Sequence, residues 1–254
     1  MKRVAIFLTL LAGCSKPTGF NPPDKPPSLG GSPVWRVRVV PCVPRAEGID
    51  KWSDAEVLGA LNRMARDFSG IGIEFDFKPI QPVYWPSLVS LDSPEDWKVI
   101  QRSSEDYANR DGYLAIWFCA TIRSCAKPPA GAEFCPTGGG VGGVGAYPSN
   151  TGYQAHGIAV AGPSALSHEV GHAFGLPHTD PVGECATSPW RGAIMSYCRG
   201  TGQGWWSPEQ VTTMRRTLIR EPRSKVATLV AGTVPKSVQA KEIGGPVGLE
   251  ICNP

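Results

Sequence analysis

The sequence predicts an α+β fold in which a sheet packs on a few helices, and three observations support this prediction. Apolar and charged residues alternate from Trp35 to Val40, which is typical of a strand. Apolar residues from Val57 to Phe68 recur on one helical face. The nearly continuous apolar run from Gly112 to Ala120 is typical of a strand buried on both faces.

The elements can be followed in order along the chain. Ser53 and Glu56 form a capping box that begins the first helix, and Gly70 and Gly72 end it. The other predicted elements are a strand at 73–80, a charged and surface-facing helix at 93–108, the strand at 112–120, a short strand at 158–161, a helix capped by Ser164, and a last helix that begins at Ser207 and Pro208.

The stretch from His168 to His178 reads H-E-x-x-H-x-x-G-x-x-H and holds three of the four histidines. On a helix, His168 and His172 lie one turn apart on one face. Gly175 permits a turn and Pro177 cannot continue the helix, so His178 can return to the same point. The spacing predicts that these three histidines bind one Zn²⁺ ion.

Glu169 is the predicted general base of this site. Three neutral imidazoles leave a zinc position open, as a catalytic site requires. Zinc lowers the pKa of a water to about 7, and Glu169 can take its proton. Peptide hydrolysis is the natural reaction. The alternatives are a chance match and a zinc site that has lost catalysis.

Met195 follows the histidine motif in the stretch Ala193–Tyr197. This stretch resembles the Met-turn of the metzincin metallopeptidases, which underlies their zinc site. The resemblance implies that Tyr197 ligates the resting zinc or hydrogen-bonds the oxyanion. Without it, Met195 would be a core methionine and Tyr197 a buried structural residue.

Thr179, Cys185 and the Met195–Tyr197 turn most resemble the pappalysin, or cytophagalysin-type, family of metzincins. Weaker matches lie at residues 53–77, 113–117, 145–148 and 206–215. The resemblance covers about residues 34–222 and departs at Ala115, where the family has Asn, and in a cysteine-bearing insert at 119–139. It implies a twisted mixed sheet above the active-site helix, an irregular lower subdomain from 179 to 222, and a cleft between them. It also implies that a structural Ca²⁺ ion could bind, although the sequence has no calcium-loop spacing.

The glycine-rich stretch from Gly140 to Gly145 fits G-x-G-x-x-G. Turn residues follow it at 147–150, whereas a dinucleotide site needs a helix there, so that function is rejected. The resemblance implies instead that Val144, Gly145 and Ala146 form the edge strand that pairs with an extended substrate. A flexible glycine loop is the alternative for residues 137–143.

The chain begins with a basic segment and a short apolar segment, which together read as a signal peptide over residues 1–13. Leu11–Cys14 resembles a bacterial lipobox, which predicts an acylated Cys14 inserted in a lipid bilayer. The proline- and glycine-rich residues 14–33 would form a tether. Ser15 favours the outer membrane, on its periplasmic or surface side. An ordinary secreted protein is the alternative.

The export signal favours disulfides among the seven cysteines that remain after Cys14. We predict a bridge between Cys185 and Cys198, which flank the Met-turn. Residues 119, 125 and 135 form a local cysteine cluster, with Cys42 and Cys252 as distant candidates. The tail from 223 to 254 receives no function from its sequence.

The 25 basic and 22 acidic residues nearly balance. Without a basic stripe, a nucleic-acid partner is excluded, and we expect a monomer that acts on proteins or peptides. Two other functions remain open. One is a catalytically silent, zinc-containing surface lipoprotein that binds a partner, and the other is an amidase acting on cell-wall peptides.

Overall fold

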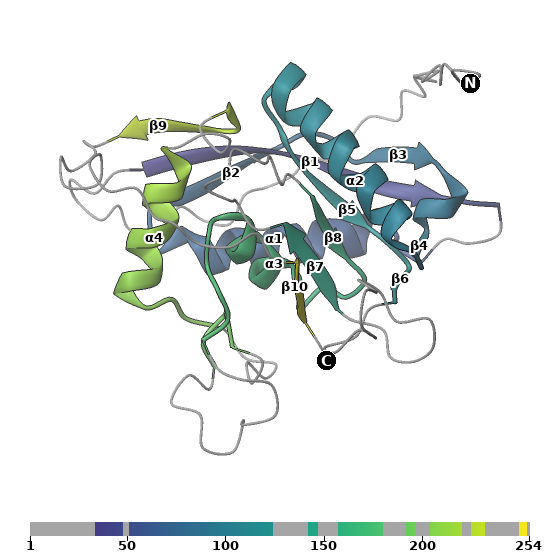
Figure 1. Cartoon of the computed structure of the whole chain (residues 1–254). Helices are drawn as coiled ribbons and strands as arrows, with labels where there is room; N and C mark the ends of the chain where they lie inside the picture. Colours follow the sequence, from purple (N-terminus) through teal and green to yellow (C-terminus); the bar gives the residue numbers. More distant parts are fainter. Residues whose placement is uncertain are drawn as a thin grey trace.

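One eight-stranded sheet crosses the molecule, with helices on both of its faces (Figure 1). The computed structural model describes residues 34–47, 51–123, 142–146, 157–179, 192–196, 204–219, 225–231 and 249–252. The strands of the sheet are β1 (Val34–Arg45), β2 (Ile73–Phe77), β3 (Gln81–Tyr84), β5 (Leu114–Phe118), β7 (Gly143–Ala146), β8 (Ile158–Val160), β9 (Ala227–Ala231) and β10 (Leu249–Cys252).

The helices are α1 (Asp54–Ser69), α2 (Pro94–Asp106), α3 (Leu166–Ala173) and α4 (Pro208–Leu218), with a 3-10 turn η1 (Pro86–Leu88) and a π-helical turn η2 (Tyr107–Asp111). Strands β4 (Ser90–Leu91) and β6 (Thr121–Ile122) form a small separate sheet. None of the helices in the described part of the chain has the length and apolar character needed to cross a bilayer.

The main sheet is mixed, as predicted. Its order is β10-β7-β8-β5-β1-β2, with β3 and β9 also paired to β1. Strand β1 runs parallel to β2, β3 and β5, and β5 runs parallel to β8. Strands β9, β7 and β10 are antiparallel to their neighbours. The parallel centre therefore ends in antiparallel strands on the side of β7.

Alternation along β5 builds the two halves of the core. Ile116 and Phe118 belong to the cluster that includes residues of α1 and α3, whereas Ala115 and Trp117 belong to the cluster that includes residues of α2. All five residues of β5 are buried. Because both faces of β5 are covered, its sequence is apolar at every position, which confirms the prediction for this strand.

Capping boxes begin α1 and α4, as the sequence predicts for α1. The Ser53 side chain accepts from the Glu56 backbone N–H, and Glu56 accepts from the Ser53 N–H in return. Ser207 and Gln210 make the same pair of contacts at α4. Each box satisfies backbone donors that a helix start leaves without partners.

Three local predictions were wrong in detail. Helix α2 is not simply surface-facing, because Trp97 and Ile100 are buried against the sheet. The predicted strand at 73–80 ends at Phe77, and Pro79, which cannot donate a ladder hydrogen bond, separates β2 from β3. Helix α3 has Ala165 rather than Ser164 at its N-cap position, without a side-chain cap, because residues 163–165 already form a turn.

Candidate metal centre

Helix α3 carries His168 and His172 one turn apart, and both side chains are buried. Gly175 follows the helix with a φ of +87°, a conformation that suits glycine. A Cβ there would also stand 2.6 Å from Thr217 Oγ1 of α4. The chain therefore turns sharply after the helix, and His178 returns to the other two histidines as predicted.

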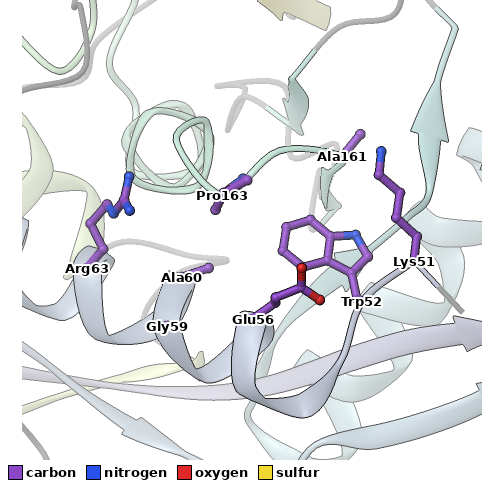
Figure 2. Close-up of a pocket in the computed structure, with 8 residues that line it drawn as sticks. All are labelled: Lys51, Trp52, Glu56, Gly59, Ala60, Arg63, Ala161 and Pro163. Atoms are coloured by element: carbon purple, nitrogen blue, oxygen red, sulfur yellow. The ribbon is translucent and has the colours of Figure 1, made fainter.

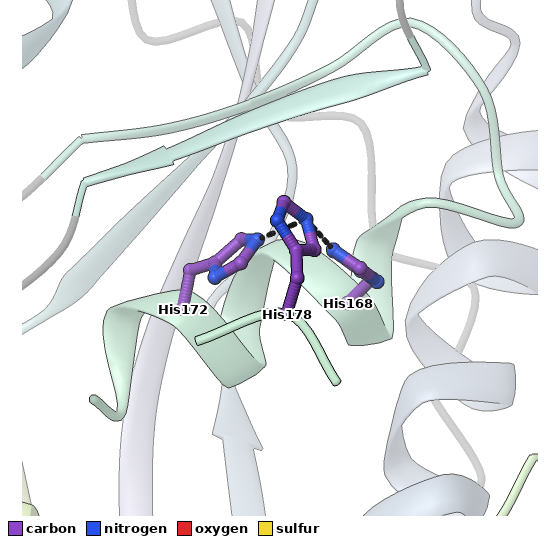
Figure 3. Close-up of side chains that lie close together, drawn as sticks. All are labelled: His168, His172 and His178. Atoms are coloured by element: carbon purple, nitrogen blue, oxygen red, sulfur yellow. Dashed lines mark hydrogen bonds between the residues drawn. The ribbon is translucent and has the colours of Figure 1, made fainter. Parts of the chain in front are cut away.

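The three imidazoles converge on one point (Figure 3). His178 Nε2 lies 2.9 Å from His168 Nε2 and 3.1 Å from His172 Nε2. Three nitrogens bound tetrahedrally to zinc at 2.0–2.1 Å would lie about 3.3 Å apart. The spacing of the three ring nitrogens is therefore close to that of a zinc site.

Backbone carbonyls set the orientation of the two helical imidazoles. His168 Nδ1 lies 2.7 Å from the Ile194 carbonyl oxygen, and His172 Nδ1 lies 2.7 Å from that of Leu176. Because a carbonyl oxygen only accepts, each Nδ1 carries the hydrogen and donates it. A neutral ring then turns an unprotonated Nε2 toward the shared point, as a metal ligand requires.

The electrostatics of His172 also fit a metal ligand. Burial, together with the imidazoles of His168 and His178, lowers the pKa of His172 well below its usual 6.5. His172 is therefore neutral at neutral pH, with its lone pair available. A neutral imidazole suits zinc, which binds imidazole nitrogen readily.

Glu169 is fully buried, and strand β7 passes directly against it. A Cβ on Gly143 would stand 2.5 Å from Glu169 Cγ and 2.7 Å from its Oε1. A Cβ on Gly145 would stand 3.0 Å from Glu169 Oε2 and 3.0 Å from His172 Cβ. Only glycine at these two positions lets the strand lie this close to the carboxylate.

Met195 lies against α3. It is fully buried, and a Cβ on Gly171 would collide with its sulfur. Its carbonyl accepts from the Thr179 backbone N–H at 3.1 Å, next to the third histidine. The adjacent Ile194 supplies the carbonyl that holds His168. The turn therefore supports two of the three histidines.

Four predicted residues lie outside the described part of the chain: Tyr197, Cys185, Cys198 and Cys14. Their assignments stay predictions. Val144, Gly145 and Ala146 form part of strand β7, which pairs with β8. They were predicted as the edge strand, but β7 is not the edge of the sheet, because β10, which the sequence did not predict, pairs with its other side.

Two cysteines that were candidates for disulfides are free thiols. Cys42 on β1 and Cys119 just after β5 are fully buried. Burial raises the pKa of Cys42 to about 12, and burial raises the pKa of Cys119 further still. Both thiols therefore stay protonated and serve as small apolar side chains in the core.

A separate pocket lies between α1 and the chain that leads into α3 (Figure 2). It is lined by Lys51, Trp52, Glu56, Gly59, Ala60, Arg63, Ala161 and Pro163. Lys51 Nζ donates to the Ala120 carbonyl, and the Glu56 side chain caps α1. Two of its charged groups thus hold the surrounding structure, and none of the three histidines lines it.

Among the described residues, the three histidines are the group of His, Cys, Asp and Glu that could hold a metal ion. The Ca²⁺ that the resemblance implied therefore has no acidic cluster in this part of the chain. This leaves one candidate metal centre in the described residues, formed by α3 and the turn that follows it.

Three contributions to the site were not predicted. The backbone carbonyls of Ile194 and Leu176 could not be predicted from the sequence, because every residue has a backbone carbonyl. Gly143 was read only as part of a glycine-rich stretch. Its alternation with Gly145 across Val144 was the available signal, since two glycines on one face of a strand indicate a close approach.

No protein-family model matches the sequence, and no curated protein matches it. Among solved structures, the chain is similar to mature mirolysin of Tannerella forsythia in complex with a cleaved peptide, with a TM-score of 0.45 and 16% identity over 77% of this chain and 96% of that one. It is also similar to metalloproteinase-II of Bacteroides fragilis, with a TM-score of 0.40 and 12% identity over 72% of this chain and 52% of that one. Both similarities are low, so the function that we propose rests on the residues of this chain.

Proposed function

We propose that the protein is a zinc-dependent endopeptidase. The observation that carries the proposal is the convergence of three imidazoles next to a buried carboxylate. His168, His172 and His178 bring their Nε2 atoms together, and Glu169 lies one residue from the first of them. A closed structural site would use four protein ligands, whereas this one offers three and a base.

Each of these residues would have a separate role in hydrolysis. When bound, zinc polarises the scissile carbonyl and lowers the pKa of a water. Glu169 accepts the proton of the attacking water and then delivers it to the leaving amine. The Ile194 and Leu176 carbonyls hold two imidazoles in place, which keeps the site in its productive geometry.

An extended peptide would lie along β7, on the side where β10 pairs with it in this structure. Backbone groups at a sheet edge pair with extended chains regardless of their side chains. Gly143 and Gly145 bring this strand against Glu169, so a peptide held there would present its bonds next to the base. Such recognition suits an endopeptidase better than an amidase, whose cell-wall substrate is not a regular extended chain.

We further assign the chain to the metzincins, closest to the pappalysin-like type. The third histidine, Thr179 and the buried Met195 support this assignment. In it, Tyr197 stabilises the oxyanion. A Tyr197→Phe variant would then lose most of its kcat and little of its zinc, as measured by steady-state kinetics and metal analysis.

The central test is Glu169→Gln, which keeps the shape of the side chain and removes its basicity. We expect cleavage of fluorescein-labelled casein to fall about 10²- to 10⁴-fold, because a general base contributes about that factor. Zinc content, measured by mass spectrometry, should not change. Glu74→Gln on β2, whose carboxylate pairs with Arg36 near the surface, is the control and should keep full activity.

The outcome also separates the rival functions. Wild-type protein that binds one zinc and cleaves no peptide would support the silent binding lipoprotein. Release of peptidoglycan fragments with casein left intact would support the amidase. A Glu169→Gln variant with full activity would overturn the mechanism.

We also propose a lipid anchor at Cys14 in the bacterial envelope. The sequence Leu11–Cys14 supports it. Cys14→Ser should move the protein from the membrane fraction to the soluble fraction and abolish incorporation of labelled palmitate. An unchanged fractionation would favour an ordinary secreted protein.

A further inference from the structure

The C-terminal strand β10 occupies the edge of the sheet next to the metal centre (Figure 1). It pairs antiparallel with β7, in the register Leu249 with Ala146, Glu250 with Gly145, Ile251 with Val144, and Cys252 with Gly143. The pairing joins the end of the chain to a strand more than a hundred residues earlier. All four residues of β7 are therefore paired with β10.

Strand β7 has no unpaired side. Its other side is paired with β8, through Gly143 with Val160, Val144 with Ala159 and Gly145 with Ile158. Backbone groups of a strand point alternately to its two neighbours, so an incoming peptide could pair with β7 only where β10 now lies. Two chains cannot occupy that edge at once.

Strand β7 is also the strand that lies against the proposed base. The α3-facing positions of β7 are Gly143 and Gly145, which lie against Glu169. Neighbouring strands are about 4.8 Å apart, so β10 lies one strand away from the strand that touches Glu169. A substrate peptide that took the place of β10 would therefore also lie one strand away from β7 and Glu169.

We infer that β10 is an internal competitor, which holds the enzyme latent by taking the place of the substrate on β7. The inference rests on the proposed peptidase function. A tethered strand acts at an effective concentration on the order of millimolar, so even a short pairing can keep the edge filled. Substrate must then displace β10, and its apparent affinity falls by the fraction of molecules in which the edge is open.

The test removes the pairing while keeping the rest of the chain. Glu250→Pro and Ile251→Pro are made separately in the full-length, zinc-loaded protein. Because neighbouring residues alternate, one of the two prolines removes a ladder hydrogen bond to β7, and the proline ring disfavours the strand in both. A chain ending at Gly248 removes the strand completely.

We expect the KM for fluorescein-labelled casein to fall roughly tenfold in the truncated chain, with kcat within about twofold, because only access to the edge changes. A synthetic peptide of residues 248–254, with Cys252→Ser to prevent oxidation, should inhibit the truncated chain competitively. The same peptide in scrambled order is the control. An unchanged KM, or inhibition by both peptides alike, would overturn the inference.

Hydrogen exchange separates this inference from the proposed function. In the full-length protein the amides of β7 that face β10 should exchange slowly, and in the truncated chain they should exchange faster. The amides of β9, at a distant part of the sheet, should not change. If no variant cleaves any peptide, the peptidase proposal fails, and the exchange of β7 still decides whether β10 covers this edge.

Discussion

At the scale of single residues, the two glycines of β7 shape the candidate metal centre together with the histidines. Gly143 and Gly145 face α3, and Val144 between them packs into the other half of the core. The alternation of a strand thus puts the missing side chains where Glu169 needs room. The histidine motif was readable from spacing alone, whereas this contact depends on how β7 docks, which spacing does not encode.

A Gly143→Ala substitution tests this contact. The added methyl would displace the Glu169 carboxylate, and we expect kcat to fall about 10- to 100-fold, since a displacement of about 1 Å can cost that much. Zinc content should stay at one ion. Gly59→Ala is the matched control, because a Cβ there meets nothing within 4 Å in α1. Equal kcat values for the two variants would contradict the role of Gly143.

The buried thiols give a second prediction at this scale. Cys42 and Cys119 should resist alkylation by iodoacetamide in the folded protein and react once urea unfolds it, because burial raises the pKa of both. Mass spectrometry of alkylated peptides measures this directly. Finding either residue in a disulfide of the native protein would contradict the structure.

At the scale of elements, α3 is held to α1 by a buried polar contact. Ser167 Oγ donates to Asp67 Oδ2 at 2.5 Å, and Trp206 Nε1 donates to the Asp67 carbonyl at 2.8 Å. The capping boxes and apolar faces of the helices were predictable from local sequence. The contact of Ser167 with Asp67 joins residues a hundred positions apart, so no local pattern indicates it.

Replacing Ser167 with Ala should lower the free energy of unfolding by about 1–3 kcal/mol, the usual cost of removing one partner of a buried hydrogen bond. Urea denaturation followed by fluorescence measures the change. Ser69→Ala removes an exposed hydrogen bond to the Arg66 carbonyl and is the control, with an effect within about 0.5 kcal/mol. A similar loss of unfolding free energy in both variants would show that the buried hydrogen bond stabilises the fold no more than the exposed one.

Strand β10 marks the limit of prediction from sequence at this scale. Leu249–Cys252 lies in the tail to which we assigned no function, and its weak alternation covers too few residues to predict a strand. Its conformation depends on its partner β7 rather than on its own propensity. The two capped helices and the histidine site could be predicted because each depends on residues close together in sequence, whereas the mixed sheet was predicted only through the family resemblance, since its strands pair over long distances in the chain.

At the scale of the whole molecule, the protonation of His172 couples the candidate metal centre to the stability of the fold. The folded chain keeps the pKa of His172 well below 6.5, whereas the unfolded chain binds a proton there at about 6.5. The contribution of His172 to stability is therefore present above pH 6.5 and is lost as the pH falls from 6.5 toward the lower pKa of the folded state.

The urea midpoint of the metal-free protein should therefore fall as the pH is lowered from about 7.5 to about 5.5. His172→Gln, which cannot titrate, should show a smaller fall. Adding zinc at pH 7.5 should raise the midpoint of the wild type more than that of this variant, because the ion binds the folded state. The same pH dependence in both proteins would contradict the assignment to His172.

The long first strand has a consequence for how the chain reaches this structure. Strand β1 pairs with β9 from Val34 to Val37 and with β5 from Val39 to Cys42. A chain interrupted before residue 227 would leave the start of β1 with an open edge, which is a template for pairing with other molecules. Incomplete chains, rather than the full-length protein, should therefore be the species that aggregates, and folding should be slow because its pairings span most of the sequence.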